Sequence, residues 1–269
     1  MNQRIGIIDS GVGGLTVAKE VMKTLPHESI VYFGDDARCP YGNKTVEDIE
    51  QFTFEMVEYV SKFHLKALII ACNTATAVAF DKIKQAFPFP VIGVIDPGAQ
   101  AVVDATKTKK IGVIATTRTI DSNLYETKVK EKDESIHVVS HACPLLVPII
   151  EKGGIKTMEE LALIESSLQG VKEKGIDALV LGCTHYPMIR REIQAIMGSH
   201  VQLIDPSYQT TKELSNILIQ QQKLNTHKEG KHLFFTSGDP VSFKQLADNW
   251  LNLDIDVQHV SLAQKRQAL

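Results

Sequence analysis

The sequence predicts an α/β fold with two pseudo-symmetric α/β domains, mainly parallel sheets, and an active site in the interdomain cleft. Short apolar runs alternate with longer segments of helical period, which is typical of parallel sheets covered by helices. Similar strings of residues also recur in the two halves of the chain. The length of 269 residues, with 43% hydrophobic and 23% charged residues, suits a globular chain of one or two domains.

The first half is expected to contain four buried strands and at least one long helix. The strands are continuous apolar runs, as in sheets covered on both faces, and they span residues 4–8, 29–33, 66–71 and 90–94. A helix is predicted from about Thr45 to Phe63, with Thr45 and Asp48 as its start signal. Its apolar stripe comprises Val46, Ile49, Phe52, Met56, Val60 and Phe63.

The same alternation returns in the second half and again near the C-terminus. Strands of the second half are expected at residues 110–114, 135–139, 177–181 and 201–204. A further strand is predicted at residues 232–236. The helix after it is expected to begin at Ser242, with Gln245 as its partner in a capping box.

Three similarities at nearly one offset predict that the two halves share a fold. RIGII at residue 4 resembles KIGVI at residue 110, and the strand before Cys72 resembles the strand before Cys183. The tripeptide Ile-Asp-Pro occurs at 95–97 and at 204–206, where we expect the chain to cross between the halves. Because strands and helices continue further, the first domain is predicted to be discontinuous. The predicted domains are residues 1–96 plus 207–269, and residues 97–206.

The charge and the cysteine content exclude several classes of protein. Twenty-nine basic and 32 acidic residues give a net charge of -3, so no nucleic-acid partner and no membrane-surface partner are predicted. The N-terminus lacks a basic and then apolar leader, and no apolar run reaches the roughly 18 residues of a membrane helix. We therefore expect a cytoplasmic chain with four reduced cysteines.

The motifs favour neither a metal site nor a nucleotide site. The nine histidines form no HxH or HExxH motif and no cluster with cysteines, so no metal is predicted. In the loop from Asp9 to Gly14, Thr16 replaces the third glycine of a dinucleotide fingerprint, and no P-loop motif occurs. Asp9 at a strand end suits a cationic amine or a proton transfer, and a plain tight turn is the alternative.

Cys72 and Cys183 are the candidate reactive cysteines. Each follows an apolar strand and precedes a predicted helix, which places both where open α/β sheets bind ligands. The free N–H groups of a helix N-terminus lower the pKa of a nearby thiol. A lone cysteine at a strand end is more often a buried apolar residue, but equivalent positions in two halves and polar neighbours favour reactivity. Cys39 and Cys143 lack this setting and are interpreted as structural.

Two facing thiols suit the inversion of an acidic carbon. One thiolate removes a proton while the opposite thiol delivers one to the other face, whereas a single nucleophilic cysteine would leave one half without a role. An α-carbon holds its proton more tightly than a thiol of pKa about 8.5, so the site must stabilise a carbanion. Backbone N–H groups at helix N-termini, with water excluded, are the available means.

Six segments resemble those of the glutamate racemases, members of the aspartate/glutamate racemase family. They occur in the same order over nearly the whole chain and are IIDSGVGGLTV, GDDARCPYG, IIACNTATA, CPLLVPIIEKG, LGCTHYPMI and FFTSGDPVSF. The resemblance implies an isomerase that interconverts L- and D-glutamate with two bases and no cofactor, and so supplies D-glutamate for peptidoglycan. It also implies a homodimer with glutamate as its small-molecule substrate.

The resemblance further implies roles for individual residues. Cys72 would act on D-glutamate with help from Asp9, and Cys183 would act on L-glutamate with help from His185. Glu151 would be a further carboxylate near the second thiol. The substrate would be held by Ser10, Tyr41, Gly42, Asn73, Thr74, Thr116, Thr119, Thr184 and His185.

Two residues depart from the family's pattern. Asp36 and Cys39 stand in the GDDARCPYG loop where we expect uncharged or non-thiol residues, which leaves substrate affinity open. Taken alone, the Pro40–Gly42 segment of this loop is interpreted as a solvated turn. The long N-terminal extension linked in some relatives to activation by a cell-wall precursor is not in this sequence, so no such activation is expected.

Three other functions are alternatives. Aspartate racemase uses the same paired thiols and differs by one methylene in its substrate, so only the resemblance favours glutamate. An amino-acid-binding module with two lobes would use the same cleft, but it has no reason to place thiols on both faces. A redox switch, in which Cys72 and Cys183 form a disulfide, would lose free thiols under mild oxidation without acting on an amino acid.

Overall fold

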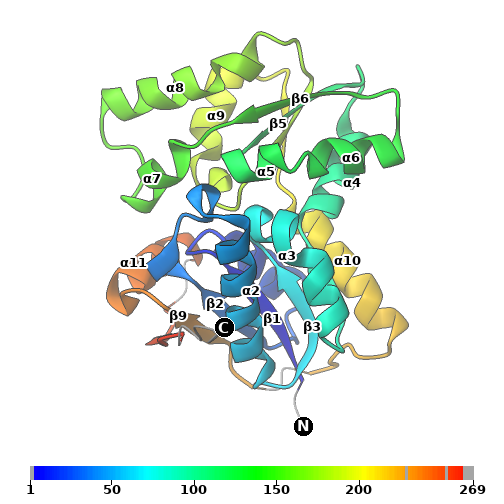
Figure 1. The fold of residues 1–269 in the computed structure, drawn as a ribbon, viewed down its shortest axis with the longest axis vertical. Coiled ribbons are helices and arrows are strands. Elements are labelled where there is room, and N and C mark those ends of the chain that lie inside the picture. The colour runs from blue at the N-terminus through cyan, green and yellow to red at the C-terminus, as the bar shows by residue number, and fades with distance from the viewer. Residues whose placement is uncertain (1–2, 228–229, 252–253, 263–269) are drawn as a thin grey trace.

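The chain forms two α/β halves, each built around a parallel sheet (Figure 1). The computed structural model describes residues 3–227, 230–251 and 254–262. In Figure 1 the upper half is made by the middle of the sequence and the lower half by its two ends. The predicted fold class, α/β with two mainly parallel sheets, is confirmed.

The first sheet takes strands from both ends of the chain. Its order is β10-β9-β2-β1-β3-β4, and every neighbouring pair is parallel. The strands are β1 (Arg4–Asp9), β2 (Ile30–Gly34), β3 (Leu65–Ile70), β4 (Val91–Gly93), β9 (Leu233–Thr236) and β10 (Val257–His259). The sequence predicts all of them except β10. This edge strand has three residues, and its last two are exposed, so it carries no apolar pattern.

The second sheet repeats the strand order of the first. Its order is β6-β5-β7-β8, which corresponds to β2-β1-β3-β4 and confirms the predicted pseudo-symmetry. The strands are β5 (Lys110–Ala115), β6 (His137–Ala142), β7 (Ala178–Gly182) and β8 (Gln202–Ile204). The prediction of residues 135–139 for β6 is wrong at both ends. The backbone N–H of Ser135 turns back to the Asp133 carboxylate at 2.9 Å, and pairing with β5 continues to Ala142.

Helices pack against both sheets. In the first half they are α1 (Leu15–Thr24), α2 (Val46–Ser61), α3 (Asn73–Ala86) and α11 (Pro240–Leu251). In the second half they are α5 (Thr117–Asp121), α6 (Leu124–Lys132), α7 (Leu146–Glu151), α8 (Met158–Lys172) and α9 (Arg190–Met197). Within the described residues, the short 3-10 helices are η1 (Asp36–Arg38), η2 (Tyr41–Asn43) and η3 (Tyr186–Ile189).

Two helices join the halves. Helices α4 (Ile95–Ala105) and α10 (Ser207–Gln220) begin at or just after the two Ile-Asp-Pro segments, each beyond the last strand of a sheet. Helix α4 leaves the first sheet and packs against β7 and α6, whereas α10 leaves the second sheet and packs against α1. The expected crossings therefore lie at these helices. The domain boundaries at 96/97 and 206/207 stay a prediction.

Both sheets are buried on both faces. On the first sheet, Ile5 and Ile7 of β1 pack in one core with α1 and α10, and the neighbouring Ile8 packs in another with α2 and α3. The second sheet likewise separates two apolar clusters. This double burial makes each central strand a continuous apolar run in the sequence. Within the described residues, no helix combines the length and the apolar character that a membrane span requires.

The predicted capping signals can be compared with the structure at the starts of two helices. Thr45 caps α2 as predicted, because its hydroxyl accepts a hydrogen bond from the Asp48 N–H at 3.1 Å. The prediction for Ser242 is wrong, since Ser242 lies inside α11 and its N–H donates to the Asp239 carboxylate at 3.0 Å. Val46 is also outside the predicted buried stripe, because it lies in the first turn of α2 with 39% of its surface exposed.

Candidate active site

The candidate active site lies where the carboxyl ends of strands from the two sheets meet. Asp9 ends β1, Cys72 follows β3, and Cys183 follows β7. A cavity of about 10 Å³ lies between the halves and is lined by both. The lining residues are Ser10, Pro40, Tyr41, Gly42, Cys72, Asn73, Thr74, Thr116, Val147, Cys183, Thr184 and His185.

Most residues predicted for the site line this cavity, and three lie just behind the lining. Asp9, Thr119 and Glu151 are each hydrogen-bonded to a residue of the lining. Pro40 and Val147 belong to the lining, but the sequence does not single them out as site residues. An apolar or proline side chain carries no chemical signal that distinguishes a site residue from a packing residue.

Cys72 lies at the N-terminus of α3, where a backbone N–H acts to lower its pKa but other effects outweigh it. The sulfur accepts a hydrogen bond from the Ala75 N–H at 3.4 Å and lies 3.5 Å from the hydroxyl of Ser10. Burial, together with the negative charge of Asp9, raises the pKa of Cys72 to about 12. The predicted lowering is therefore wrong for this thiol. Its thiolate, once formed, is a strong base.

Asp9 is a fully buried carboxylate that touches both halves. It accepts hydrogen bonds from the Gly11 N–H at 3.0 Å and from the Thr184 hydroxyl at 3.1 Å. Burial raises the pKa of Asp9 to about 6, although the charge of His185 and these hydrogen bonds act in the opposite direction. A plain turn cap does not require a partner from the second half. The arrangement instead suits a group that exchanges a proton near neutral pH.

Cys183, His185 and Glu151 form a chain of polar contacts in the second half. The sulfur of Cys183 lies 3.7 Å from His185 Nδ1, and His185 Nε2 hydrogen-bonds to Glu151 Oε1. Burial opposes the charged imidazole, but the hydrogen bonds to Cys183 and Glu151 raise the pKa of His185 well above its usual value. Burial likewise acts to raise the pKa of Glu151, and the hydrogen bond from His185 lowers it overall. These contacts favour the charged imidazole over the neutral one.

The segment after Cys183 differs from that after Cys72. The helix predicted after Cys183 does not begin at once, because the chain first forms the 3-10 helix η3 and only then α9. The Tyr186 N–H bonds to the carbonyl oxygen of Cys183 at 3.1 Å, which closes a tight turn directly after the thiol. The two halves therefore present their thiols on different local structures.

Hydroxyl groups from both halves meet at one end of the cavity. The Oγ1 atoms of Thr74 and Thr116 are 2.9 Å apart, and Thr119 Oγ1 is 3.0 Å from that of Thr116. The Asn73 amide oxygen accepts a hydrogen bond from the Tyr125 hydroxyl at 2.7 Å. Thr74 and Asn73 begin α3, whose first N–H groups favour an anion. This end of the cavity is therefore suited to a carboxylate.

The loop that carries η2 closes the cavity from the first half. Tyr41 is buried, and its hydroxyl donates a hydrogen bond to Asp35. Gly42 lies against Thr116 of the second half, because a Cβ at Gly42 would stand 2.8 Å from Thr116 Cβ. The interpretation of this loop as a solvated turn is therefore wrong.

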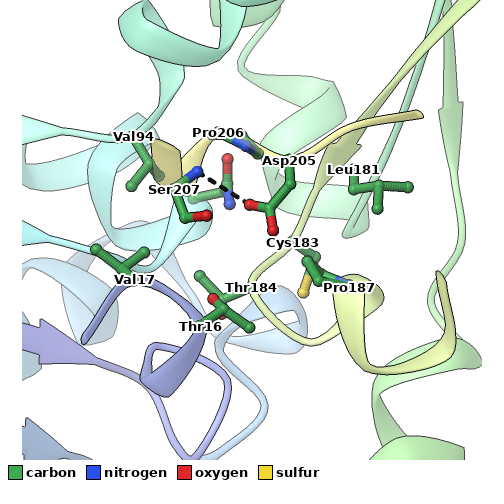
Figure 2. Close-up of a pocket in the computed structure, with 11 residues that line it drawn as sticks. Thr16, Val17, Val94, Leu181, Cys183, Thr184, Pro187, Asp205, Pro206 and Ser207 are labelled. Carbon is green, nitrogen blue, oxygen red and sulfur yellow. Dashed lines mark hydrogen bonds between the residues drawn. The ribbon is translucent and has the colours of Figure 1, made fainter. Parts of the chain in front are cut away.

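A second cavity of about 10 Å³ lies behind Cys183 and Thr184 (Figure 2). Asp205, between β8 and α10, lines it and accepts a hydrogen bond from the Ser207 N–H at 2.9 Å. A space of this volume holds about one water molecule. The sequence does not predict Asp205 or Ser207 as neighbours of the site, although the repeated Ile-Asp-Pro marks their position.

The other two cysteines differ from each other. Cys143 is buried and donates a hydrogen bond to the carbonyl oxygen of Ser167 at 3.3 Å, as suits a structural residue. Cys39 is half-buried, and its sulfur lies 3.7 Å from Glu151 Oε1. The donor atoms of Cys39, Glu151 and His185 all lie within 4.8 Å of one another. Motif spacing misses this group because its members are far apart in the sequence.

Comparison with known proteins gives matches over most of the chain. The family model described as Asp/Glu/Hydantoin racemase matches residues 5–213. A glutamate racemase from Enterococcus faecalis is 48% identical over 254 residues, which are 94% of this chain and 93% of that protein. A glutamate racemase from Bacillus cereus is 43% identical over 264 residues, which are 97% of this chain and 98% of that protein.

Solved structures with similar sequences share the fold. The crystal structure of a glutamate racemase isoform from Bacillus anthracis has a TM-score of 0.92 at 45% identity and covers 97% of this chain and 98% of its own. That of the glutamate racemase from Francisella tularensis in complex with D-glutamate has a TM-score of 0.89 at 39% identity, with the same coverage of 97% and 98%. The similarity extends over both halves.

Proposed function

This chain belongs to the Asp/Glu/hydantoin racemase family, and on that premise we propose that it interconverts L-glutamate and D-glutamate with Cys72 and Cys183 as the two bases. It is an isomerase of the amino-acid racemase class, and its relatives at 48% and 43% identity are glutamate racemases. One observation carries the mechanism. Cys72 and Cys183 line the same cavity from opposite halves, each with an acid–base group of its own.

The proposed reaction moves one proton off the α-carbon and another onto its opposite face. From D-glutamate, the Cys72 thiolate takes the α-proton and the Cys183 thiol donates its own proton. From L-glutamate the two cysteines exchange these roles. Asp9 assists Cys72, and His185, held by Glu151, assists Cys183. Each assisting group has a pKa shifted by its surroundings, as groups that relay protons often do.

The substrate's charged groups are proposed to bind at the polar ends of the cavity. A carboxylate would take hydrogen bonds from Asn73, Thr74 and Thr116 beside the N-terminus of α3. Thr119 would orient the hydroxyls of Thr74 and Thr116 rather than contact the substrate. Fixed donors in a buried site stabilise the carbanion as negative charge moves from the α-carbon into the carboxylate. Ser10, Tyr41, Gly42, Thr184 and His185 complete the proposed substrate contacts.

Glutamate enters only if the halves separate. The cavity of about 10 Å³ holds roughly one water molecule, which is far less than an amino acid needs. The contact of Gly42 with Thr116 must therefore open for each substrate molecule and close again for the reaction. We also propose that the enzyme acts in the cytoplasm as a homodimer and provides D-glutamate for peptidoglycan synthesis.

Incubation with L-glutamate in D₂O tests the function. We expect the optical rotation to fall to zero while the α-carbon gains deuterium, because the proton donated by each thiol exchanges with solvent. If the folded protein changes neither the optical rotation nor the deuterium content of the α-carbon, the proposal is contradicted. In a parallel incubation with L-aspartate, turnover faster than that of L-glutamate would identify an aspartate racemase. Loss of free thiols under mild oxidant, without turnover of either amino acid, would indicate a redox switch instead.

Gly13→Ala is expected to lower kcat about 100-fold while the protein stays folded. A Cβ at Gly13 would stand 2.5 Å from both His185 Nδ1 and Thr184 Oγ1, so both side chains must move. Their displacement disturbs the contacts with Cys183 and Asp9. Racemisation rates and urea unfolding measure the two effects separately.

Gly112→Ala is the matched control for this substitution. Its Cβ would stand 2.6 Å from Ile176 Cδ1, in the core beside β5 and away from the cavity. Overpacking there lowers the free energy of unfolding by about 1–3 kcal/mol and leaves kcat of the folded protein unchanged. If Gly13→Ala behaved like Gly112→Ala, the close fit of the Asp9–Gly14 loop would not matter for catalysis.

A further inference from the structure

A cluster of chemically different donor groups lies at the edge of the site and includes His185 of the cavity lining. Cys39 Sγ lies 3.7 Å from Glu151 Oε1, and Glu151 Oε1 hydrogen-bonds to His185 Nε2. All three donor atoms lie within 4.8 Å of one another. Among the residues that the structure describes, no other group of three or more cysteine, histidine and carboxylate donors comes so close together.

Gly11 lies directly against this cluster. A Cβ at Gly11 would stand 3.2 Å from Glu151 Oε1, 3.3 Å from Cys39 Sγ and 3.7 Å from Asp36 Oδ1. Polar atoms of three side chains, from both halves of the molecule, thus lie close around Gly11. Cys39 is half-buried and the Glu151 side chain is 22% exposed, so solvent reaches the edge of the cluster.

We propose that Cys39, Glu151 and His185 form a binding site for Zn²⁺, and that the bound ion inhibits the enzyme. A thiolate, an imidazole nitrogen and a carboxylate are the ligands that zinc prefers, with bonds of about 2.0–2.3 Å. Tetrahedral bonds of that length separate two ligand atoms by about 3.5 Å, close to the Cys39–Glu151 spacing of 3.7 Å. Asp36 or a water molecule would take the fourth position.

Zinc binding would change the hydrogen bonding, the protonation and the charge balance of this cluster. The ion separates His185 Nε2 from Glu151 Oε1 and takes the place of the proton that they share. The thiol proton of Cys39 leaves to the solvent as sulfur coordinates the metal. The negative charges of Asp36 and Glu151, which repel each other across the cluster, are both compensated by the ion.

The inhibition, unlike the binding, rests on the proposed function. His185 is the group that assists Cys183, and its Nδ1 lies 3.7 Å from that sulfur. When zinc holds the His185 ring through Nε2, the ring no longer exchanges a proton with Glu151. Cys183 then loses its acid–base partner. Because every turnover uses both cysteines, we expect both directions of the reaction to slow in proportion to occupancy.

Zinc affinity and racemisation are measured on the same metal-stripped protein. A chromophoric chelator that competes for Zn²⁺ gives the affinity and the stoichiometry, and Co²⁺ replaces zinc to report a thiolate-to-metal absorption band. We expect one Zn²⁺ per chain, a Co²⁺ thiolate band, and inhibition that a chelator reverses. Absence of stoichiometric binding overturns the site. Binding without inhibition overturns the regulatory part, and binding by a protein that racemises no glutamate retains the site while rejecting the proposed function.

Variants at three cysteine positions assign the ligand. Cys39→Ser, with Cys39→Ala as a second variant, should keep racemisation without zinc, bind Zn²⁺ at least about 100-fold more weakly and lack the Co²⁺ band. Cys143→Ser, a matched change in the core, should bind zinc as the unaltered protein does. Cys72→Ser should be inactive and still bind. Unchanged affinity in both Cys39 variants, or lost binding in Cys72→Ser, would place the metal on other thiols and overturn the proposal.

Discussion

Cys72→Ser and Cys183→Ser are each expected to lower kcat/KM for racemisation by about 10³-fold or more in both directions. Each cysteine serves as base in one direction and as acid in the other, so neither direction survives the loss of one thiol. A serine hydroxyl fills nearly the same space but is a far weaker acid than a thiol. Polarimetry from both enantiomers, at matched concentrations of folded protein, measures the loss.

Deuterium exchange shows which enantiomer of glutamate each cysteine deprotonates. In D₂O, Cys183→Ser retains Cys72 and should wash deuterium into D-glutamate without inverting it. Cys72→Ser should do the same with L-glutamate only. The Cys143→Ser variant, whose cysteine is buried away from the cavity, should racemise at the unaltered rate. Near-normal racemisation by either catalytic variant, or exchange with the same enantiomer in both, would remove the two-base mechanism.

The parts of the fold that could be predicted are those whose signal is local. Strands buried on both faces are continuous apolar runs, and the polar residues at their carboxyl ends, such as Asp9, Cys72 and Cys183, mark the site directly. The repeat of such ends in two halves predicts that the two cysteines approach each other. Both line one cavity.

What could not be predicted depends on distant residues packing together. Cys39 looks like a structural residue in the sequence, because the carboxylate it contacts lies in the other half of the molecule. The pKa of Cys72 follows burial and Asp9 rather than the helix N-terminus, and burial is a property of the whole fold. Ser242 shows a local limit, since Asp239 three residues earlier is an equally good cap and Pro240 favours the earlier start.

The second large effect is expected on stability, at a buried ion pair far from the chemistry. Lys66, near the start of β3, and Glu28, before β2, are each about 2% exposed. Their Nζ and Oε2 atoms are 2.5 Å apart. Lys66 also donates to the carbonyl oxygen of Lys223 at 2.7 Å, and Glu28 accepts from the Asn225 N–H at 2.9 Å. The pair thus fixes the segment after α10, where the chain returns to the first sheet.

Lys66→Met is expected to lower the free energy of unfolding by about 3–5 kcal/mol. Methionine fills the volume of the lysine stem, but the Glu28 carboxylate is left buried without its counter-charge, and the carbonyl oxygen of Lys223 loses a donor. Urea unfolding followed by circular dichroism measures the change. Lys82→Met is the matched control, because Lys82 pairs with Glu50 on the surface with 61% of its side chain exposed, and its loss should cost less than about 1 kcal/mol.

The double variant Glu28→Leu/Lys66→Met separates the value of the pair from the cost of breaking it. Removing both charges leaves no buried ion, so most of the stability lost in Lys66→Met should return. The Asn225 N–H then lacks its acceptor, and this lost hydrogen bond should keep the double variant below the unaltered protein. A double variant no better than Lys66→Met would mean that the contacts to residues 223–225, rather than charge compensation, hold the returning segment against the first sheet.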